Sequence, residues 1–360
     1  MEQFYCKTKI ISGAGAVKAL SELGIHRLLV VTDPYFMKNG TAQRIGAVTG
    51  AEKIEYFDGV QPDPTVELAA TATGLMRQVQ PDTLIALGGG STMDLAKAMA
   101  YFGGEQVRLV AIPTTSGSGS EVTNFSILTH GKTKHPLVDE KIQPHVAILD
   151  SDLLNQLPAG LIADTGFDVL CHALEAYVAT DAGAISDALA ADAFQGVYAN
   201  LPASFHGNLQ VRQRIHTAAT MAGMAFSQAG LGICHAIAHS LGGLFHVPHG
   251  RLNAILLPAV IDCNAHAAAA KYAKLARIAG LGGAADTVAV RNLKNALIRL
   301  RKELKMPETL AQAGIEPGLV WHHSRQIVQA VLEDPCCKTN PLSVEDFMVR
   351  RILEEVTGRA

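Results

Sequence analysis

The stretch Leu84-Ile-Ala-Leu-Gly-Gly-Gly-Ser-Thr-Met-Asp94 reads as a short buried strand, a glycine turn and the start of a helix. Ser91, with Asp94 three residues later, resembles the capping box that begins many helices. Glycines at such a turn let a pyrophosphate approach the free amides of the helix N-terminus, which makes the turn a candidate nucleotide site. A tight turn without a ligand is the alternative, because the motif is neither G-x-G-x-x-G nor a P-loop with its lysine.

Alternation of strand and helix continues through the first 150 residues. Apolar, β-branched runs at 27–32, 83–87, 107–112 and 146–149 predict buried strands. Residues 65–79 form a helical pattern, for which we expect Asp63 as the cap and Pro64 at the first helical position. Strands that alternate with helices predict a parallel sheet covered on both faces, in a Rossmann-like α/β arrangement.

Two further segments follow predicted strands in this half. The run Pro113-Thr-Thr-Ser-Gly-Ser-Gly-Ser-Glu121 offers hydroxyl groups and flexible backbone to a phosphate or nucleotide, the alternative being a plain polar loop. Asp33 follows the strand at 28–32, where its carboxylate either bonds an adenosine ribose, which favours NAD over NADP, or caps a helix. Loops at strand ends of an open sheet are where ligands bind in such folds.

Beyond about Pro158 the strand-like runs end. Ala-rich helical patterns cover residues 185–199, 211–225, 265–279 and 287–304, and in the last of these four leucines recur at helical spacing (Leu293, Leu297, Leu300 and Leu304). We therefore predict an α/β dinucleotide-binding domain at 1–158 and an all-helical metal-binding domain at 159–360. We expect the two domains to pack closely and to leave a cleft between them.

Five candidate metal ligands lie in the second half. Asp168 and His172 are one helical turn apart, so both side chains point from the same helix face. His235 and His239 repeat that spacing. We expect the proline before His249 to end their helix, so that His249 turns back toward the same point.

One carboxylate with three imidazoles suits Fe²⁺ or Zn²⁺ and is too rich in nitrogen for Mg²⁺ or Ca²⁺. Five candidates compete for four positions, so one histidine should stay unligated. A single Asp or His on a helix is usually an ordinary polar residue, but several buried imidazoles in one apolar segment each need a partner. We expect Cys171 and Cys234 to pack in the core away from the site, because adjacent helical residues point about 100° apart.

Composition limits the classes of function. The 360 residues are 48% hydrophobic and 18% charged, with a net charge of −3, which provides no basic field for nucleic acid or an anionic membrane. Six scattered cysteines predict free thiols in a reducing compartment rather than a disulfide framework. Residues 1–9 lack the apolar core of a signal peptide, so we expect a cytoplasmic protein.

These motifs together resemble the iron-containing alcohol dehydrogenase family, whose architecture is shared with dehydroquinate synthase. The resemblance covers almost the whole chain and is carried by Gly88–Ser91 with Asp94 and Lys97, Pro113–Glu121, Thr165–Tyr177 and His235–Gly250, with Pro62–Thr65 and Thr339–Pro341 near the two ends. Met224–Gly232 and Phe245–Gly250 look most like the 1-propanol and ethanol dehydrogenases of bacterial microcompartments.

The resemblance implies a role for individual residues. It implies Asp168, His172, His235 and His249 as ligands of Fe²⁺, with Zn²⁺ a frequent occupant, and it leaves His239 unligated beside the nicotinamide. It implies a cofactor site for NAD(H) at Asp33, Gly89, Gly90, Ser91, Asp94, Thr114, Thr115 and Lys134. Phe226 and Cys336 would line the alcohol pocket, and both are equally typical of a plain core.

Three positions depart from the family pattern. Ser118 replaces a usual threonine, Cys171 stands where threonine is common, and the short segment 130–134 weakens the assignment of Lys134. None of these departures touches a ligand position. The family also suggests a homodimer, and the closest subfamily allows a location inside a bacterial microcompartment.

The implied reaction is NAD-dependent reduction of a short aldehyde, propionaldehyde or acetaldehyde, to its primary alcohol. The ion would polarise the carbonyl, and His239 or a relay through the ribose hydroxyl would deliver the proton. A zinc-dependent, glycerol-type polyol dehydrogenase is one alternative. A metal-dependent lyase or synthase on the same fold is another, although the sequence shows no dense Lys and Arg cluster near the histidines for a polyanion. A non-catalytic shell partner would need an amphipathic extension before the first strand, and none is visible between Met1 and Tyr5.

Overall fold

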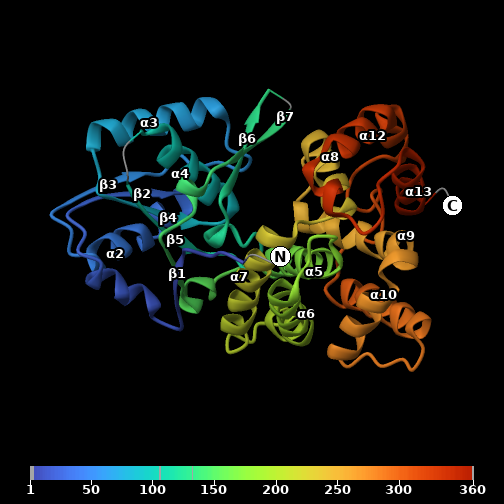
Figure 1. Cartoon of the computed structure of the whole chain (residues 1–360). Helices are drawn as coiled ribbons and strands as arrows, with labels where there is room; N and C mark the ends of the chain where they lie inside the picture. Colours follow the sequence, from blue (N-terminus) through green and yellow to red (C-terminus); the bar gives the residue numbers. More distant parts are fainter. Residues whose placement is uncertain (1–3, 105–106, 132, 359–360) are drawn as a thin grey trace. The chain divides into compact units, whose positions relative to one another are not determined.

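The computed structural model describes residues 4–104, 107–131 and 133–358, and it divides into two compact units. One unit is Tyr5–Leu157, and the other runs from Pro158 to the end of the described residues and includes Phe4. In Figure 1 the first unit has the blue to green colours and the second the green to red colours of the sequence.

The first unit is built on a six-stranded parallel sheet with the strand order β1-β8-β5-β4-β2-β3. The strands are β1 (Lys9–Ser12), β2 (Arg27–Thr32), β3 (Lys53–Phe57), β4 (Thr83–Gly88), β5 (Arg108–Pro113) and β8 (Val146–Leu149). A separate antiparallel hairpin is formed by β6 (Phe125–His130) and β7 (Thr133–Val138). The four predicted strands and the parallel sheet are confirmed, whereas β1, β3 and the hairpin were not predicted.

Both faces of the sheet are buried. Along β4, Leu84 joins a core with α3 (Val66–Val79) and α4 (Gly90–Phe102), whereas Ile85 joins the opposite core with α2 (Thr41–Val48) and the 3₁₀ turn η1 (Ala16–Glu22). Successive strand side chains point to opposite faces, so a sheet covered on both sides requires an unbroken apolar run. Burying such a side chain contributes about 1.5–3 kcal/mol. The remaining helical elements of this unit are α1 (Pro34–Lys38), η2 (Ser120–Val122), η3 (Glu140–Ile142) and η4 (Ser151–Leu154).

The predicted start of α3 was wrong. The cap of α3 is Thr65, whose Oγ1 accepts a hydrogen bond from the amide of Leu68 at 3.1 Å. Asp63 instead has a positive φ of 53° and pairs with Lys134, so it lies outside the helix. The local sequence pattern therefore identified the helix α3 but not the residue that caps it.

The predicted capping box at α4 is absent, because Gly89 is the N-cap and Ser91 already lies in the first turn. A Cβ at Gly88 would lie 2.1 Å from Oγ1 of Thr92, so the close packing of strand end and helix start requires glycine there. This turn owes its shape to missing side chains and not to a side-chain cap.

The second unit contains no strand among its described residues, which confirms the predicted helical half. Its helices are α5 (Ala159–Val178), α6 (Ala184–Phe205), α7 (Arg212–Ala229), α8 (Ile233–Phe245), α9 (His249–Ile278), α10 (Asp286–Glu303), α11 (Pro317–His322), α12 (Ser324–Glu333) and α13 (Asp346–Thr357), with the 3₁₀ turn η5 (Pro335–Thr339). Helix α5 contacts α6, α7 and α9 and is buried along most of its length. The predicted leucine stripe on α10 is buried.

Helix α9 is longer than the sequence pattern predicts, because it continues through Pro258. Proline inside a helix typically costs about 3 kcal/mol, but here the neighbouring Leu256 and Leu257 are fully buried and their packing opposes that loss. The helix is long and apolar enough to span a membrane, yet 67% of its most apolar window is buried inside the protein. Such burial is typical of the core helix of a globular domain.

Candidate metal centre and nucleotide site

Helix α5 supplies one side of a polar cluster inside the second unit. Asp168 and His172 lie one turn apart and are 8% and 6% exposed. Oδ1 of Asp168 accepts a hydrogen bond of 2.8 Å from the Asn253 side chain on α9. One turn before Asp168, Asp164 forms an ion pair with Arg251, which fastens the start of α9 to α5.

His235 reaches this cluster from the first turn of α8. Its Nε2 lies 3.9 Å from Oδ1 of Asp168, and its ring stacks on that of His172 with centroids 4.5 Å apart. The other nitrogen, Nδ1, lies 2.6 Å from Oε2 of Glu175. Glu175 also accepts hydrogen bonds from the backbone amides of Gly232 and Cys234, so one carboxylate holds both the helix start and the imidazole.

His249 is the first residue of α9, and its Nε2 lies 3.7 Å from Oδ1 of Asp168. The predicted role of Pro248 was wrong: α8 ends at Phe245 with His246 in the left-handed region at φ 55°, and Pro248 is instead the N-cap of α9. Proline is compatible with a helix start because its missing amide hydrogen would have no helical partner there. The next residue is Gly250, where a Cβ would lie 1.9 Å from the carbonyl oxygen of Asp164.

Three imidazoles therefore gather around the carboxylate of Asp168. Ligand atoms of Asp168, His172 and His235 lie within 4.8 Å of one another, and Nε2 of His249 lies 3.7 Å from Oδ1 of Asp168. Burial raises the pKa of Asp168, and the charge of His172 and the hydrogen bond from Asn253 oppose that shift. Burial and the positive charges of neighbouring histidines lower the pKa of His235 well below its usual value. A neutral imidazole is the form that binds a metal, and the donor set of one carboxylate and three imidazoles fits Fe²⁺ or Zn²⁺.

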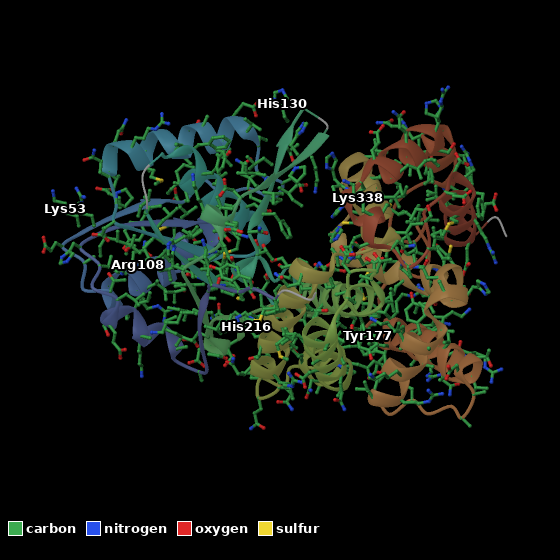
Figure 2. All side chains as sticks on the ribbon, in the orientation of Figure 1. Lys53, Arg108, His130, Tyr177, His216 and Lys338 are labelled. Atoms are coloured by element: carbon green, nitrogen blue, oxygen red, sulfur yellow. The ribbon has the colours of Figure 1, made fainter. Side chains whose placement is uncertain are left out.

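The fifth candidate, His239, lies beside this cluster. Its ring stacks on that of His249 with centroids 5.1 Å apart, and its Nδ1 lies 2.8 Å from Oδ2 of Asp334. Asp334 immediately precedes η5, where Figure 2 labels Lys338. Ligand atoms of His239, Asp334 and Cys336 lie within 4.8 Å of one another. Cys336 is thus close to His239, as its proposed place in the alcohol pocket requires.

Two neighbouring residues refine the predictions. Phe226, on α7, is 5% exposed and stacks on the His172 ring at 4.6 Å. Cys171 and Cys234 are both fully buried, as predicted, but Sγ of Cys171 lies 3.7 Å from Nδ1 of His235. We expected Cys171 to lie away from the site, but its thiol contacts the ring of His235 at Nδ1. The contact forms because α8 passes close to α5 at this point.

Sequence reasoning missed three residues that hold the cluster. Glu175 lies on the same face of α5 as His172, three residues later, and that spacing was a usable signal. Asn253 lies four residues after His249, on the same face of α9. Asp334 lies 95 residues from His239, so no local pattern indicates their contact.

The first unit places the predicted nucleotide residues at the carboxyl ends of neighbouring strands. From β2 the chain moves outward to β3 and then returns to β4 on the other side of β2. Thr32 at the end of β2 lies opposite Leu87 of β4, and its Oγ1 donates to the Leu87 carbonyl at 2.8 Å. Ligands of open α/β sheets bind at such a reversal of strand order.

Glycines of the β4–α4 turn face the hydroxyl loop that follows β5. A Cβ at Gly89 would lie 3.3 Å from Oγ1 of Thr115, and one at Gly90 would lie 3.4 Å from the Ser118 side chain. The Thr114 amide donates to the carbonyl of Gly88 at 3.0 Å. The loop and the turn thus lie side by side at the N-terminus of α4, where backbone amides are available to bind a pyrophosphate.

Three other predicted cofactor residues make contacts of their own. Asp33 caps α1, with Oδ1 accepting from the amides of Tyr35 and Phe36. Asp94 lies near the fully buried Lys97, and burial raises the pKa of its carboxyl to about 6 while the lysine charge opposes the shift. Lys134 on β7 forms an ion pair of 2.7 Å with Asp63.

Comparisons with known proteins identify the family of both halves of the chain. The pattern of the iron-containing alcohol dehydrogenases matches residues 7–151, and the C-terminal pattern of the Fe-containing alcohol dehydrogenase family matches residues 162–357. A 1-propanol dehydrogenase of Citrobacter freundii is 39% identical over 370 residues, which cover 99% of this chain and 100% of the relative. An NADPH-dependent butanol dehydrogenase of Clostridium saccharobutylicum is 36% identical over 384 residues, with 98% and 97% covered.

Two solved structures have the same fold. An iron-containing alcohol dehydrogenase from Thermococcus thioreducens superposes with a TM-score of 0.92 at 32% identity, over 99% of this chain and 100% of the other. A sulfoacetaldehyde reductase from Bifidobacterium kashiwanohense, solved in complex with NAD⁺, gives a TM-score of 0.90 at 26% identity over 100% of both chains. Both halves of the sequence and the whole fold therefore match, and the chain belongs to the iron-containing alcohol dehydrogenase family and is an alcohol dehydrogenase of the iron type.

Proposed function

We propose that the protein uses NADH to reduce a short aliphatic aldehyde, propionaldehyde or acetaldehyde, to its primary alcohol. The observation that carries the proposal is the convergence of two imidazoles, from His235 and His249, on Oδ1 of Asp168 at 3.9 and 3.7 Å, with His172 stacked beside them. The two relatives that are named for propanol and butanol support a short aliphatic substrate.

Asp168, His172, His235 and His249 would hold Fe²⁺, with Zn²⁺ as an alternative occupant. When bound, the ion supplies a Lewis acid that polarises the carbonyl oxygen. The protein's contribution is to keep its donor atoms in place: Glu175 orients His235, and Asn253 holds the carboxylate of Asp168. Such supporting contacts fix the orientation of the ligands before the ion arrives.

His239 would move the proton. An imidazole can donate and accept protons near neutral pH, so it can supply the proton that the new alkoxide needs, directly or through a ribose hydroxyl. Phe226 and Cys336 would line the pocket for the alkyl group, because one stacks on His172 and the other lies beside His239.

The cofactor would bind in the first unit, so that residues 1–158 form the dinucleotide domain and 159–360 the metal domain. Gly89, Gly90, Ser91, Thr114 and Thr115 would contact the pyrophosphate, and Asp33 would lie beside the adenosine ribose. Asp94 on α4 and Lys134 on β7 would also contact the cofactor. The negative charge of Asp33 opposes a 2′-phosphate, which favours NADH, although one relative is named as NADPH-dependent.

The experiment compares substrates and metals in one preparation. Protein purified without oxygen is analysed for iron and zinc, and NADH oxidation is measured with acetaldehyde, propionaldehyde, lactaldehyde and dihydroxyacetone. We expect bound iron and the highest kcat/KM with propionaldehyde or acetaldehyde. Preference for dihydroxyacetone with bound zinc would establish the glycerol-type alternative instead, and the family match already disfavours a lyase or synthase.

Two matched variants connect the activity to the cluster. His235→Ala should abolish both metal binding and turnover, whereas His266→Ala, at an exposed position of α9, should change neither. Activity that survives loss of His235 would refute the proposed site. A cytoplasmic homodimer, and its enclosure in a bacterial microcompartment, remain proposals that size-exclusion chromatography and cell fractionation test.

A further inference from the structure

Both histidines of α8 have a carboxylate at Nδ1, and the two carboxylates come from different parts of the chain. Glu175 of α5 faces His235 at 2.6 Å, and Asp334 faces His239 at 2.8 Å. The first pair supports a proposed metal ligand. The second supports a histidine for which no ligand role is proposed, so its carboxylate needs a different explanation.

Asp334 is held in one position by the turn that it caps. Its backbone is extended between α12 and η5, and its Oδ1 accepts the amide of Cys336 at 2.8 Å. That bond leaves Oδ2 directed at the imidazole of His239. The Asp334 side chain is only 13% exposed, so water competes little for this contact. Helix α12 contacts α8, which fixes the distance between the two elements.

The surroundings of Asp334 favour its ionised form. Burial by itself would raise the pKa of this carboxyl, but the hydrogen bond and charge of His239 and the amide of Cys336 lower it below the usual value. An ionised carboxylate only accepts hydrogen bonds, so the contact at 2.8 Å requires a hydrogen on Nδ1 of His239. The neutral imidazole then carries its lone pair on Nε2.

We infer that Asp334 is a positioning residue, which fixes the tautomer and the ring orientation of His239 so that Nε2 is the nitrogen that exchanges the proton. The inference rests on the proposed role of His239 and deepens it. It assigns to Asp334, between α12 and η5, an indirect part in proton transfer through His239, although the two residues lie 95 positions apart in the sequence.

The test uses Asp334→Asn, which keeps an oxygen for the Cys336 amide but presents an NH₂ group to His239. That group donates to Nδ1 and so favours the opposite tautomer. We expect kcat to fall by about 10- to 100-fold, because a positioned general acid contributes on the order of 10²–10⁴. Iron content, the Kd of NADH and the melting temperature should stay unchanged. Glu333→Gln, at the exposed neighbouring position, is the matched control and should have full activity.

A double-mutant cycle shows whether Asp334 acts through His239. In the His239→Ala background, Asp334→Asn should cause no further loss of kcat, and Asp334→Glu alone should retain more activity than Asp334→Asn because it keeps the charge. An equal loss in both backgrounds, or full activity of Asp334→Asn, would overturn the inference.

A spectroscopic measurement separates this inference from the role of His239 itself. In zinc-loaded protein labelled with ¹⁵N-histidine, ring nitrogen shifts of His239, assigned with His239→Ala, should show hydrogen on Nδ1 and should change to the other tautomer in Asp334→Asn. Identical tautomers in both proteins would refute the positioning by Asp334. Full turnover of His239→Ala would refute the proposed proton transfer, while the shifts would still decide what Asp334 does to the ring.

Discussion

Glu175 and His235 are joined by a contact of 2.6 Å between Oε2 and Nδ1, and the same carboxylate accepts the backbone amides that begin α8. Glu175 is 2% exposed, and burial raises its pKa to about 7, with the amides of Cys234 and Gly232 opposing the shift. A buried carboxylate at this place orients the imidazole and increases its basicity as a ligand.

Replacing Glu175 by Gln should weaken metal binding. The amide of Gln retains an oxygen that accepts hydrogen bonds from the α8 backbone, but it lacks the negative charge that Glu175 places beside His235. We therefore expect iron affinity to fall about 10- to 100-fold. Competition with a chelator, followed by metal analysis, measures the change. Glu303→Gln, at an exposed position of α10, is the control. Unchanged affinity in Glu175→Gln would show that the contact with His235 does not support the ligand.

A methyl group at Gly250 should displace the start of α9. An added Cβ would lie 1.9 Å from the Asp164 carbonyl oxygen and 3.1 Å from Cβ of Asp168, so Gly250→Ala should move His249 away from α5. Overpacking of this kind typically costs about 1–3 kcal/mol. Thermal unfolding and iron content report the two effects. Gly243→Ala, where a Cβ meets nothing within 4 Å, should leave both unchanged or raise stability slightly.

Replacing Asp33 by Asn should change the cofactor preference. Asparagine is as good a helix cap as aspartate, so α1 and the melting temperature should be preserved. The negative charge near the proposed ribose is lost, and kcat/KM with NADPH should rise relative to NADH. Steady-state kinetics with both cofactors gives the ratio. A ratio equal to that of the unchanged protein would mean that Asp33 only caps the helix.

Lys97 should make stability depend on pH in the alkaline range. Burial lowers its pKa to about 7 from 10.5, while the charges of Asp94 and Glu121 oppose the shift. Between these two values the unfolded chain binds a proton that the folded protein has released, so this group makes the free energy of unfolding rise with pH.

Urea denaturation at about pH 7 and about pH 9 tests this sign. The unchanged protein should gain stability relative to Lys97→Met as pH rises, whereas Lys53→Met, at an exposed position of β3, should follow the unchanged protein (Figure 2). A constant difference between the unchanged protein and Lys97→Met would show that Lys97 stays protonated, held by Ser120, Thr123 and the Phe125 carbonyl at 2.8 Å each.

The pattern of apolar residues in the sequence was sufficient to predict the buried strands of the fold. Strands with both faces covered are unbroken apolar runs, so β2, β4, β5 and β8 were predictable, whereas the edge strands β1 and β3 contain Lys9 and Lys53 and carry a weaker signal. Helix ends were less predictable, because Thr65 and Asp63 are both good caps and tertiary contacts choose between them. The continuation of α9 through Pro258 was not predictable either, because it depends on tertiary packing that the local sequence does not show.

The candidate site was predictable where its residues are close in sequence. Asp168 with His172, and His235 with His239, are set by helical spacing alone. The carboxylate partner of His239 is not predictable from helical spacing, because Asp334 lies 95 residues later in the sequence, after α9 to α12. Spacing left open which histidine is not a ligand, and the prediction that it is His239 rests on the family resemblance alone.

Along α5, four acidic or basic side chains in successive turns contact α8 or α9: Asp164, Asp168, His172 and Glu175. Inserting one residue anywhere between them would rotate everything beyond it by about 100° and separate the two halves of the set. The length of this helix can therefore drift during evolution only outside 164–175, and the spacing of these four residues should be more uniform among relatives than the length of any surface loop.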